Sequence, residues 1–309
     1  MWAAGAVSPR EDSPHRAAPQ PLVTRAAQGP AGRRPRRERG TGVAPERTGR
    51  SNAVTDDTIV TGDCLQVLPT LPAGCADLVF ADPPFNVGYQ YDVYRDRRPR
   101  AEYLTNVDEW LAAFVRVLKP TGTLCVAIGA EYAGHYQVRL GLHDRNTIVW
   151  SYNFGPHQKA KFGRNHVPIL HYTKHAKRFV FNAGAVRVES ERQRAGDKRA
   201  DPRGRVPGDV CQFPRVCGTF KERNTAGHGC QMPEALLERL IKATTNPGDL
   251  VVDPMCGTGT TLAVAKRLGR KWVGIELSKD YARAARERCE GGDGLLKVAP
   301  PLRHLSPCT

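Results

Sequence analysis

From residue 58 onward, short apolar runs alternate with segments in which apolar residues recur every three or four positions. A short apolar run predicts a buried strand, and the wider spacing predicts a helix that packs one face against its neighbours. Strands and helices that alternate along a chain are typical of an α/β fold with parallel strands. We therefore predict a doubly wound, Rossmann-like sheet.

The pattern also gives the residue ranges of the predicted elements. Strands are expected at residues 58–61, 76–81, 123–128, 146–152, 249–253 and 271–276. Helices are expected at residues 108–118, 233–243, 260–268 and 279–289. In the first of these helices Leu111, Phe114 and Leu118 share one face. The following Lys119-Pro120-Thr121-Gly122 is expected to end that helix before the next strand.

Three regions depart from this pattern. Residues 1–52 hold ten arginines and no lysine, with almost no residues that could form a core, so we expect a disordered tail. Three interpretations of this tail stay open: a basic arm that holds nucleic acid, a solvated extension without a specific function, and a transit peptide. Residues 155–230 lack periodic apolar positions and are expected to be inserted, rather than core-forming, between halves at 53–154 and 231–290. Residues 291–309, with their glycines and prolines, are expected to be a flexible tail.

Positive charge is concentrated in the inserted region. The chain has a formal net charge of +15, and residues 155–230 hold sixteen Lys or Arg against six acidic residues. This excess favours a polyanionic partner such as nucleic acid, and a solvated charged surface is the alternative. Candidate contacts to phosphates or guanine edges are Arg192, Arg194, Arg203 and Arg205. Loop 89–100 is a second candidate for contact with nucleic acid. Its candidate residues include Tyr89 and Arg95.

Composition narrows the class of protein. With 40% hydrophobic and 25% charged residues the chain can bury a core, which excludes a fibrous or wholly disordered protein. No apolar stretch approaches the roughly 20 residues that span a bilayer, and the arginine-rich start lacks the apolar segment of a signal peptide. The nine cysteines form no Cys-x-x-Cys pair, which suits reduced thiols in a cytoplasmic protein. Cys211, Cys217, His228 and Cys230 do not match zinc-ligand spacing, so we expect no metal.

The first chemical motif is a glycine-rich turn between an expected strand and an expected helix. It reads Asp253-Pro254-Met255-Cys256-Gly257-Thr258-Gly259-Thr260-Thr261. Glycines let backbone approach a ligand, so the turn predicts a nucleotide-like cofactor, with a purely structural tight turn as the alternative. No Gly-Lys-Ser/Thr follows, which excludes a P-loop, and Leu262 replaces the third glycine of a dinucleotide fingerprint. At the end of the next strand, Glu276 offers a carboxylate to two ribose hydroxyls.

The second motif, Asp82-Pro83-Pro84-Phe85, follows an expected strand at its carboxyl end, where open α/β sheets bind ligands. Two successive prolines fix the backbone, so the Asp82 carboxylate and the Pro83 carbonyl form a rigid pair of acceptors beside the Phe85 ring. Such a pair suits a planar group that carries an exocyclic NH₂. A strand-ending turn is the alternative, and the presence of the glycine motif in the same chain weakens it.

Together the motifs resemble the DNA methyltransferases that modify exocyclic amino groups, N6 of adenine or N4 of cytosine. Their order resembles the permuted β group, in which Asp-Pro-Pro-aromatic precedes the cofactor motif. The resemblance covers residues 57–290 and includes Thr61-Gly62-Asp63-Cys64, Asn246-Pro247-Gly248-Asp249 and Gly274-Ile275-Glu276. The chain departs from the family pattern at Met255, where Phe is usual, and at Met232, where Lys is usual. Methionine keeps apolar bulk but is more flexible, so an altered cofactor affinity is expected, while neither departure removes a group that the chemistry needs.

The resemblance implies S-adenosylmethionine as cofactor and double-stranded DNA as substrate. It implies that Asp63 lies near the cofactor's adenine amino group, and that Asp253 with the following turn surrounds the methionine moiety. The target base is expected to leave the duplex and stack on Phe85. Asp82 and the Pro83 carbonyl then accept its two N–H groups and align the nitrogen with the methyl donor. Residues 53–154 are thus the expected catalytic half, 231–290 the cofactor-binding half, and 155–230 the target-recognition region.

Several alternatives stay open at this stage. Adenine N6 is preferred to cytosine N4 because Asp82, rather than a serine, opens the Pro-Pro-aromatic motif. Cytosine C5 chemistry is disfavoured because the one Pro-Cys pair, Pro307-Cys308, lies in the tail. An RNA or protein-amide substrate and a catalytically silent nucleic-acid-binding subunit are the other candidates. No nuclease motif is evident, so we do not expect a fused restriction enzyme; a separate partner nuclease and a solitary enzyme both stay open. The β-group resemblance favours a homodimer.

Overall fold

The computed structural model describes residues 56–153, 158–216, 222 and 229–291. Its strands are β1 (Thr58–Thr61), β2 (Ala76–Ala81), β3 (Leu118–Ala127), β4 (His143–Ser151), β5 (His166–Thr173), β6 (Val210–Gln212), β7 (Leu250–Asp253) and β8 (Lys271–Glu276). Its helices are α1 (Cys64–Val67), α2 (Arg100–Val117), α3 (Ala133–Arg139), α4 (Glu191–Arg194), α5 (Glu234–Thr244), α6 (Thr260–Arg267) and α7 (Lys279–Glu290), with 3₁₀ turns η1 (Leu68–Thr70) and η2 (Ala183–Val186). The tails predicted at 1–52 and 291–309 lie, apart from residue 291, outside the described residues.

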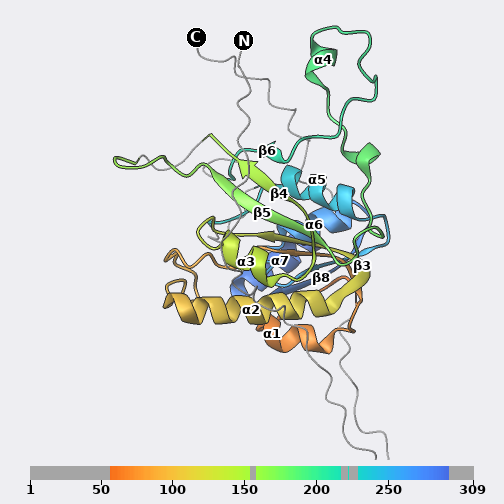
Figure 1. Cartoon of the computed structure of the whole chain (residues 1–309). Coiled ribbons are helices and arrows are strands. Elements are labelled where there is room, and N and C mark those ends of the chain that lie inside the picture. The colour runs from red at the N-terminus through yellow and green to blue at the C-terminus, as the bar shows by residue number, and fades with distance from the viewer. Residues whose placement is uncertain (1–55, 154–157, 217–221, 223–228, 292–309) are drawn as a thin grey trace, which may run out of the picture. The chain divides into compact units, whose positions relative to one another are not determined.

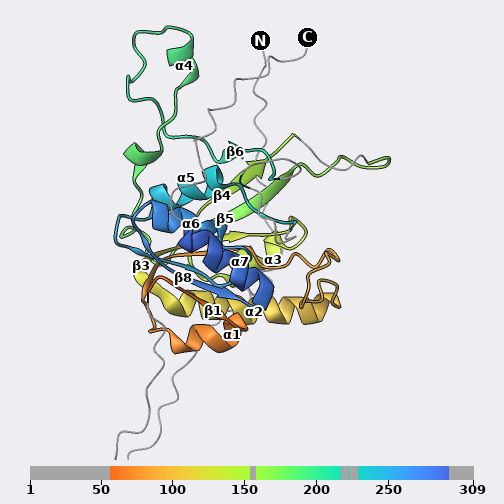
Figure 2. The same ribbon diagram turned by 180° about the vertical axis from the view of Figure 1, so that it is seen from behind.

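The described strands form one sheet in the order β1-β8-β7-β2-β3-β5-β4-β6. Strands β1, β8, β7, β2 and β3 run parallel, and β5 is antiparallel to both of its neighbours. Helices α1, α2 and α3 cover one face of the sheet, and α5, α6 and α7 cover the other (Figure 1, Figure 2). The predicted doubly wound, Rossmann-like fold is confirmed.

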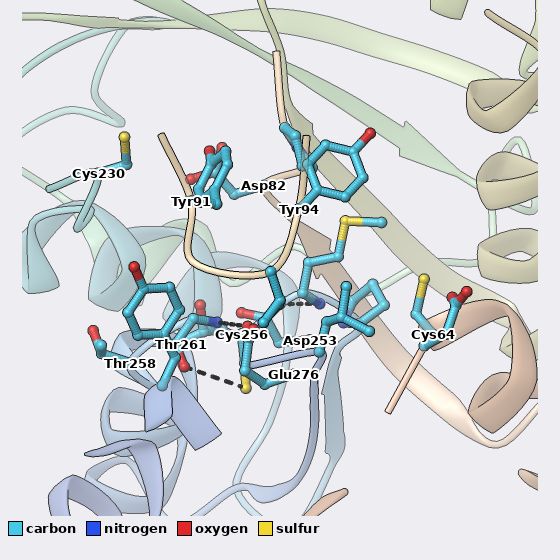
Figure 3. Close-up of a pocket in the computed structure, with 18 of the residues that line it drawn as sticks. Cys64, Asp82, Tyr91, Tyr94, Cys230, Asp253, Cys256, Thr258, Thr261 and Glu276 are labelled. Carbon is cyan, nitrogen blue, oxygen red and sulfur yellow. Dashed lines mark hydrogen bonds between the residues drawn. The ribbon is translucent and has the colours of Figure 1, made fainter. Parts of the chain in front are cut away.

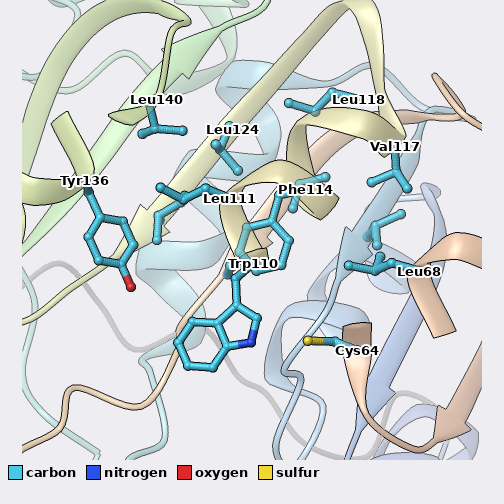
Figure 4. Close-up of a cluster of buried hydrophobic side chains, with 14 of the residues drawn as sticks. Cys64, Leu68, Trp110, Leu111, Phe114, Val117, Leu118, Leu124, Tyr136 and Leu140 are labelled. Atoms are coloured by element: carbon cyan, nitrogen blue, oxygen red, sulfur yellow. The ribbon is translucent and has the colours of Figure 1, made fainter. Parts of the chain in front are cut away.

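Strand β2 shows how the sequence produces the two layers. Successive side chains point to opposite faces, so Leu78 and Phe80 pack on the side of α5 and α6 while Val79 packs on the side of α2. On that second side Leu111 and Phe114, which were predicted to share a helical face, are buried together (Figure 4). Burial on both faces explains why the strand is one continuous apolar run.

The largest correction concerns residues 155–230. Strand β5 lies in this region, yet it occupies the sheet between β3 and β4, and its Leu170 is fully buried. The prediction that the region is not core-forming is therefore wrong for residues 166–173 and also for β6, which pairs with β4 and carries the buried Cys211. Buried polar residues obscure the apolar pattern: His171 is 5% exposed and shares a hydrogen bond of 3.0 Å with Asn146. Such partners allow polar side chains inside a core strand.

Two predicted boundaries also shift. Helix α2 begins at Arg100 instead of residue 108, because the fully buried Tyr103 and Val107 extend its apolar face. Strand β3 begins at Leu118, directly after α2, so the residues predicted to separate the helix from the strand lie within β3, at an irregularity in its pairing with β2. Gly122 suits this irregularity because a Cβ there would lie 3.0 Å from the Ala76 carbonyl oxygen. Among the described helices, none has the length and apolarity that crossing a membrane requires.

Candidate active site

The carboxyl ends of four adjacent parallel strands carry the polar groups of the site. Asp63 lies just after β1, Asp82 follows β2, Asp253 ends β7 and Glu276 ends β8. These residues surround a first cavity of about 340 Å³. A second cavity of about 270 Å³ adjoins it, and the residues that line both are Asp82, Tyr91, Cys230, Gln231 and Met232. Asp82 therefore lies where the two cavities meet.

Most of the predicted cofactor residues line the first cavity. They are Asp63, Asp253, Pro254, Met255, Gly257, Thr258, Thr260, Thr261 and Glu276. Figure 3 shows Asp253, Thr258, Thr261 and Glu276 grouped on one side of the cavity, with Asp82 and Tyr91 on the other. Gly259 does not line it: this glycine caps α6 with a φ of 77°, and a Cβ there would lie 2.9 Å from the Ala285 Cβ. A glycine is required at position 259 because its φ is positive and because α7 leaves no room for a Cβ.

Backbone amides hold Glu276 in place. Its Oε2 accepts the Gly257 N–H at 2.8 Å, and its Oε1 accepts the Ser278 N–H at 2.8 Å. Each carboxylate oxygen has two lone pairs, so Glu276 retains acceptor capacity for the hydroxyl groups of a ligand. Asp63 is also fixed by the backbone, because its side chain caps α1 by accepting the Leu65 N–H at 2.9 Å.

The structure explains why Leu262 replaces a glycine of the dinucleotide fingerprint. Gly274 of β8 faces Leu262, and a Cβ on Gly274 would collide with the leucine side chain and lie 3.0 Å from the Cys256 Sγ. In the dinucleotide fingerprint, the third glycine, on the helix, makes room for close packing of helix and strand. Here Gly274, on the strand, makes that room instead. The close packing of α6 on the sheet therefore depends on the pair rather than on either residue alone.

Three carboxyl groups of the first cavity have raised pKa values. Burial, followed by the charge of Asp253, raises the pKa of Asp82 to about 7. Burial raises the pKa of Asp253 to about 7 as well, although hydrogen bonds from Thr261 and from the Met255 N–H favour its charged form. Burial also raises the pKa of Glu276. Negative charge is thus disfavoured in this cavity until a cationic or hydrogen-bond-donating ligand compensates it.

Among the described residues, no three His, Cys, Asp or Glu side chains are arranged to hold a metal. Of the four residues considered for zinc, Cys217 and His228 lie outside the described part of the chain, while Cys211 is buried in the sheet region and Cys230 lines the two cavities.

Aromatic rings dominate the second cavity. Phe85 and Tyr89 come from the chain after β2, while Trp150 and Tyr152 come from the end of β4, with ring centroids 5.4 Å apart. Of the predicted catalytic residues, Asp82, Pro83 and Phe85 line this cavity, and Asp82 and Pro84 line the first. Apolar rings with a few polar groups on the border form a cavity suited to a planar group that donates hydrogen bonds.

Asp96 organises the loop that follows the catalytic motif, and the sequence analysis did not identify it. Its buried carboxylate accepts the N–H groups of Asn86 at 2.7 Å, Val87 at 3.2 Å and Tyr89 at 2.9 Å. Asn86 has a φ of 57°, a conformation that asparagine tolerates better than most residues. An asparagine directly after the motif is therefore a sequence pattern that indicates a turn at Asn86. Asp96 lies ten residues further along the chain, and no sequence pattern indicates its role.

The same loop contacts both the region 155–230 and the cofactor half of the chain. The Tyr89 hydroxyl accepts the Gly229 N–H at 3.0 Å, and Asp92 accepts a hydrogen bond from the Ser278 hydroxyl. Tyr89 and Tyr91 pack with ring centroids 4.8 Å apart. These contacts place Tyr91 on the border of both cavities, a position that spacing in the sequence does not reveal.

The residues predicted to bind DNA fall into two groups. Tyr89 lines the second cavity, and Arg95 is exposed on the same loop. Arg192, Arg194, Arg203 and Arg205 lie on residues 187–205 around α4, away from the residues that line the two cavities. Three of these arginines pair with acidic neighbours: Arg192 with Asp197 at 2.8 Å, Arg194 with Glu191 at 2.7 Å and Arg203 with Asp201 at 3.0 Å.

Comparison with known proteins identifies the family. A family model for N6/N4 methyltransferases, described as DNA methylase, matches residues 76–287. The DNA adenine methyltransferase YhdJ of Escherichia coli strain K12 is 38% identical over 261 residues, which cover 81% of this chain and 87% of that protein. The type II methyltransferase M.HpaI of Haemophilus parainfluenzae is 35% identical over 239 residues, covering 76% of this chain and 74% of that protein.

Solved structures agree on the fold. The cytosine-N4-specific PvuII DNA methyltransferase has a TM-score of 0.56 at 20% identity, covering 76% of this chain and 86% of its own. The M1.HpyAVI–SAM complex has a TM-score of 0.53 at 21% identity, covering 74% of this chain and 97% of its own. The permuted β group stays a prediction. The family model and the sequence relatives show that the chain belongs to the N6/N4 DNA methylases, a family of S-adenosylmethionine-dependent DNA amino methyltransferases.

Proposed function

We propose that this protein transfers the methyl group of S-adenosylmethionine to N6 of an adenine that has left the DNA duplex. The first cavity binds the cofactor, and the second cavity binds the base. The observation that carries this proposal is the position of Asp82, which lines both cavities. Transfer between two bound molecules requires such a junction, because the reacting atoms must be held in line and in contact.

The residues of the first cavity fit the cofactor. When bound, S-adenosylmethionine supplies an electrophilic methyl group on a positively charged sulfonium. The raised pKa values of Asp82 and Asp253 mark a site where a cation would offset buried negative charge. Glu276 keeps free acceptor capacity for ribose hydroxyls, and Asp63 lies on the wall where an amino group can donate to it. The volume is within the range of small-molecule sites.

The protein's part in the chemistry is orientation and electrostatics. Phe85 stacks on the base, while the Asp82 carboxylate and the Pro83 carbonyl accept its two amino N–H groups. These hydrogen bonds draw the nitrogen lone pair out of the ring and direct it toward the first cavity. Pro84 is fixed in position because its carbonyl accepts a hydrogen bond of 2.8 Å from the buried Tyr103 hydroxyl. The motif is thus rigid before the base arrives, which lowers the cost of alignment.

Adenine is the favoured base. Asp82 opens the Pro-Pro-aromatic motif, and the relative YhdJ, 38% identical, is named as a DNA adenine methyltransferase. Cytosine N4 is the second candidate because the same acceptor pair suits its amino group. The PvuII structure carries that specificity, but its 20% identity supports the fold alone.

Recognition of DNA is assigned to two surfaces. Tyr89 and Arg95 contact the strand beside the second cavity, and Arg192, Arg194, Arg203 and Arg205 of the target-recognition region 155–230 attract phosphates. Residues 53–154 supply catalysis and 231–290 supply cofactor binding. The type II names of M.HpaI and M.BglII support a place beside a separate restriction nuclease. A homodimer and a cytoplasmic location stay predictions.

Nucleoside mass spectrometry tests the proposal directly. DNA from a methylation-free host that expresses the protein should contain N6-methyladenine, and DNA from a host that expresses Asp82→Ala should contain none. N4-methylcytosine instead would keep the mechanism and change the base. Absence of both marks, with the protein folded and binding S-adenosylmethionine, would overturn the proposal.

A further inference from the structure

An aromatic side chain stands fully in solvent on the loop that joins β4 to β5. Phe162 is 101% exposed, more than any other large apolar side chain in the described residues. In both views the chain that precedes β5 projects beyond the end of the sheet (Figure 1, Figure 2). A single exposed apolar side chain is common on protein surfaces, so what distinguishes Phe162 is its surroundings.

The residues around Phe162 are basic. The described part of this loop, residues 158–165, is hereafter the basic loop; it contains Lys159, Lys161 and Arg164 and no acidic residue. The arginines near α4 differ, because most of them pair with acids of their own segment. In the basic loop, Lys159 and Lys161 are exposed and directly precede the exposed ring of Phe162. Cations next to an aromatic residue suit a partner that has both phosphates and stacked bases.

The chain segment that joins β4 to β5, which includes the basic loop, begins and ends at residues that line the second cavity. Ser151 of β4 pairs with His166 of β5, and Trp150, Tyr152, Arg164 and His166 all line that cavity. Arg164 is fixed there by an ion pair with Glu131 at 2.8 Å. Phe162 lies only two residues before Arg164, so the Cα atoms of these two residues are at most roughly 7 Å apart.

We propose that Phe162 inserts into the DNA duplex, in the gap that the target base leaves when it enters the second cavity. This inference rests on the proposed function. A flipped base leaves its neighbours and its paired base without a stacking partner, which favours its return. A phenyl ring in the gap restores stacking and holds the open state, while Lys159 and Lys161 contact the flanking phosphates.

The test uses a duplex that contains the site mapped by sequencing the methylated DNA. Phe162→Ala should lower kcat/KM on this duplex by about tenfold, given the strength of base–aromatic stacking. Phe162→Trp should retain activity. A duplex with 2-aminopurine at the target position should show a smaller fluorescence increase with Phe162→Ala. When the target base is mismatched, and so already unpaired, the deficit of Phe162→Ala should shrink to within about twofold.

Phe181→Ala is the matched control, because Phe181 is an exposed phenylalanine, 45% exposed, outside the residues that line the cavities. It should methylate like the wild type. Equal loss by Phe162→Ala on paired and mismatched duplexes would mean a contact unrelated to base opening, and unchanged activity on the paired duplex would mean no contact; either result overturns the inference. A wild-type protein that binds S-adenosylmethionine but methylates no DNA would instead overturn the proposed function.

Discussion

The first cavity and residues 187–205 use charge in opposite ways. In the cavity, carboxylates from distant parts of the chain converge at the ends of four strands, and burial raises the pKa values of Asp82, Asp253 and Glu276. Around α4, exposed arginines meet acids only a few residues away, and hydrogen bonds from Arg203 lower the pKa of Asp201 to about 2. The cavity is incomplete without a ligand, whereas the segment already satisfies much of its own charge.

This difference shows which charges matter most for function. A buried charge without a cation is costly and is maintained by the fold around it, so it marks a binding site. An exposed pair contributes little and is screened by salt. Variants in the cavity should therefore have large effects, and variants around α4 should have small ones.

The largest effect is expected from Asp82→Asn. The amide would turn one acceptor into a donor toward the base amino group, so kcat should fall roughly 100- to 1000-fold. Single-turnover methylation measures this, and calorimetry should find the affinity for S-adenosylmethionine little changed. Asp144→Asn, an exposed position on β4, is the control. Near-normal turnover by Asp82→Asn would remove Asp82 from the mechanism.

Glu276→Gln should act on the cofactor instead. Loss of a charged acceptor should weaken S-adenosylmethionine binding by roughly 10- to 100-fold, with a smaller change in kcat at saturating cofactor. Isothermal titration calorimetry gives the dissociation constant. Glu238→Gln, whose carboxylate pairs with Lys242 on α5, should bind like the wild type. An unaltered dissociation constant in Glu276→Gln would contradict the cofactor assignment of the first cavity.

The rate should depend on pH near neutrality. Because the pKa of Asp82 is raised to about 7, the acceptor form increases with pH, and kcat/KM should rise about tenfold from pH 6 to pH 8. Asp253→Asn removes a like charge from beside Asp82, so the midpoint of the remaining activity should move to lower pH. A flat profile over this range would show that Asp82 does not titrate there in the active protein.

The smallest effect is expected around α4. Replacing Arg192, Arg194 and Arg203 by alanine should weaken DNA binding by about two- to threefold per residue, because each arginine is already paired with an acid. The loss should be uniform across DNA sequences and should reduce the salt dependence of binding. Binding measured at several salt concentrations checks this. Unchanged salt dependence would exclude these arginines from the DNA interface.

Local patterns predicted much of the site and of the fold. The residues around Asp82 and Gly257 were identified because a strand, a rigid or glycine-rich turn and a helix follow one another within a few positions. Strand β5 was missed because polar residues such as His171 interrupt its apolar run, and their partners come from strand β4. Asp96 was missed because its role consists of hydrogen bonds to backbone amides up to ten residues away.

The sequence by itself determined the alternating elements, the motifs at the strand ends and the family, because each depends on neighbouring residues. The tertiary structure decided that Asp82 borders two cavities, that Gly274 makes room for Leu262, and that β5 belongs to the core. It also separated the self-paired arginines near α4 from the exposed Phe162, two residues before Arg164 of the second cavity. These features join residues far apart in the chain, and only strand order and packing bring such residues together.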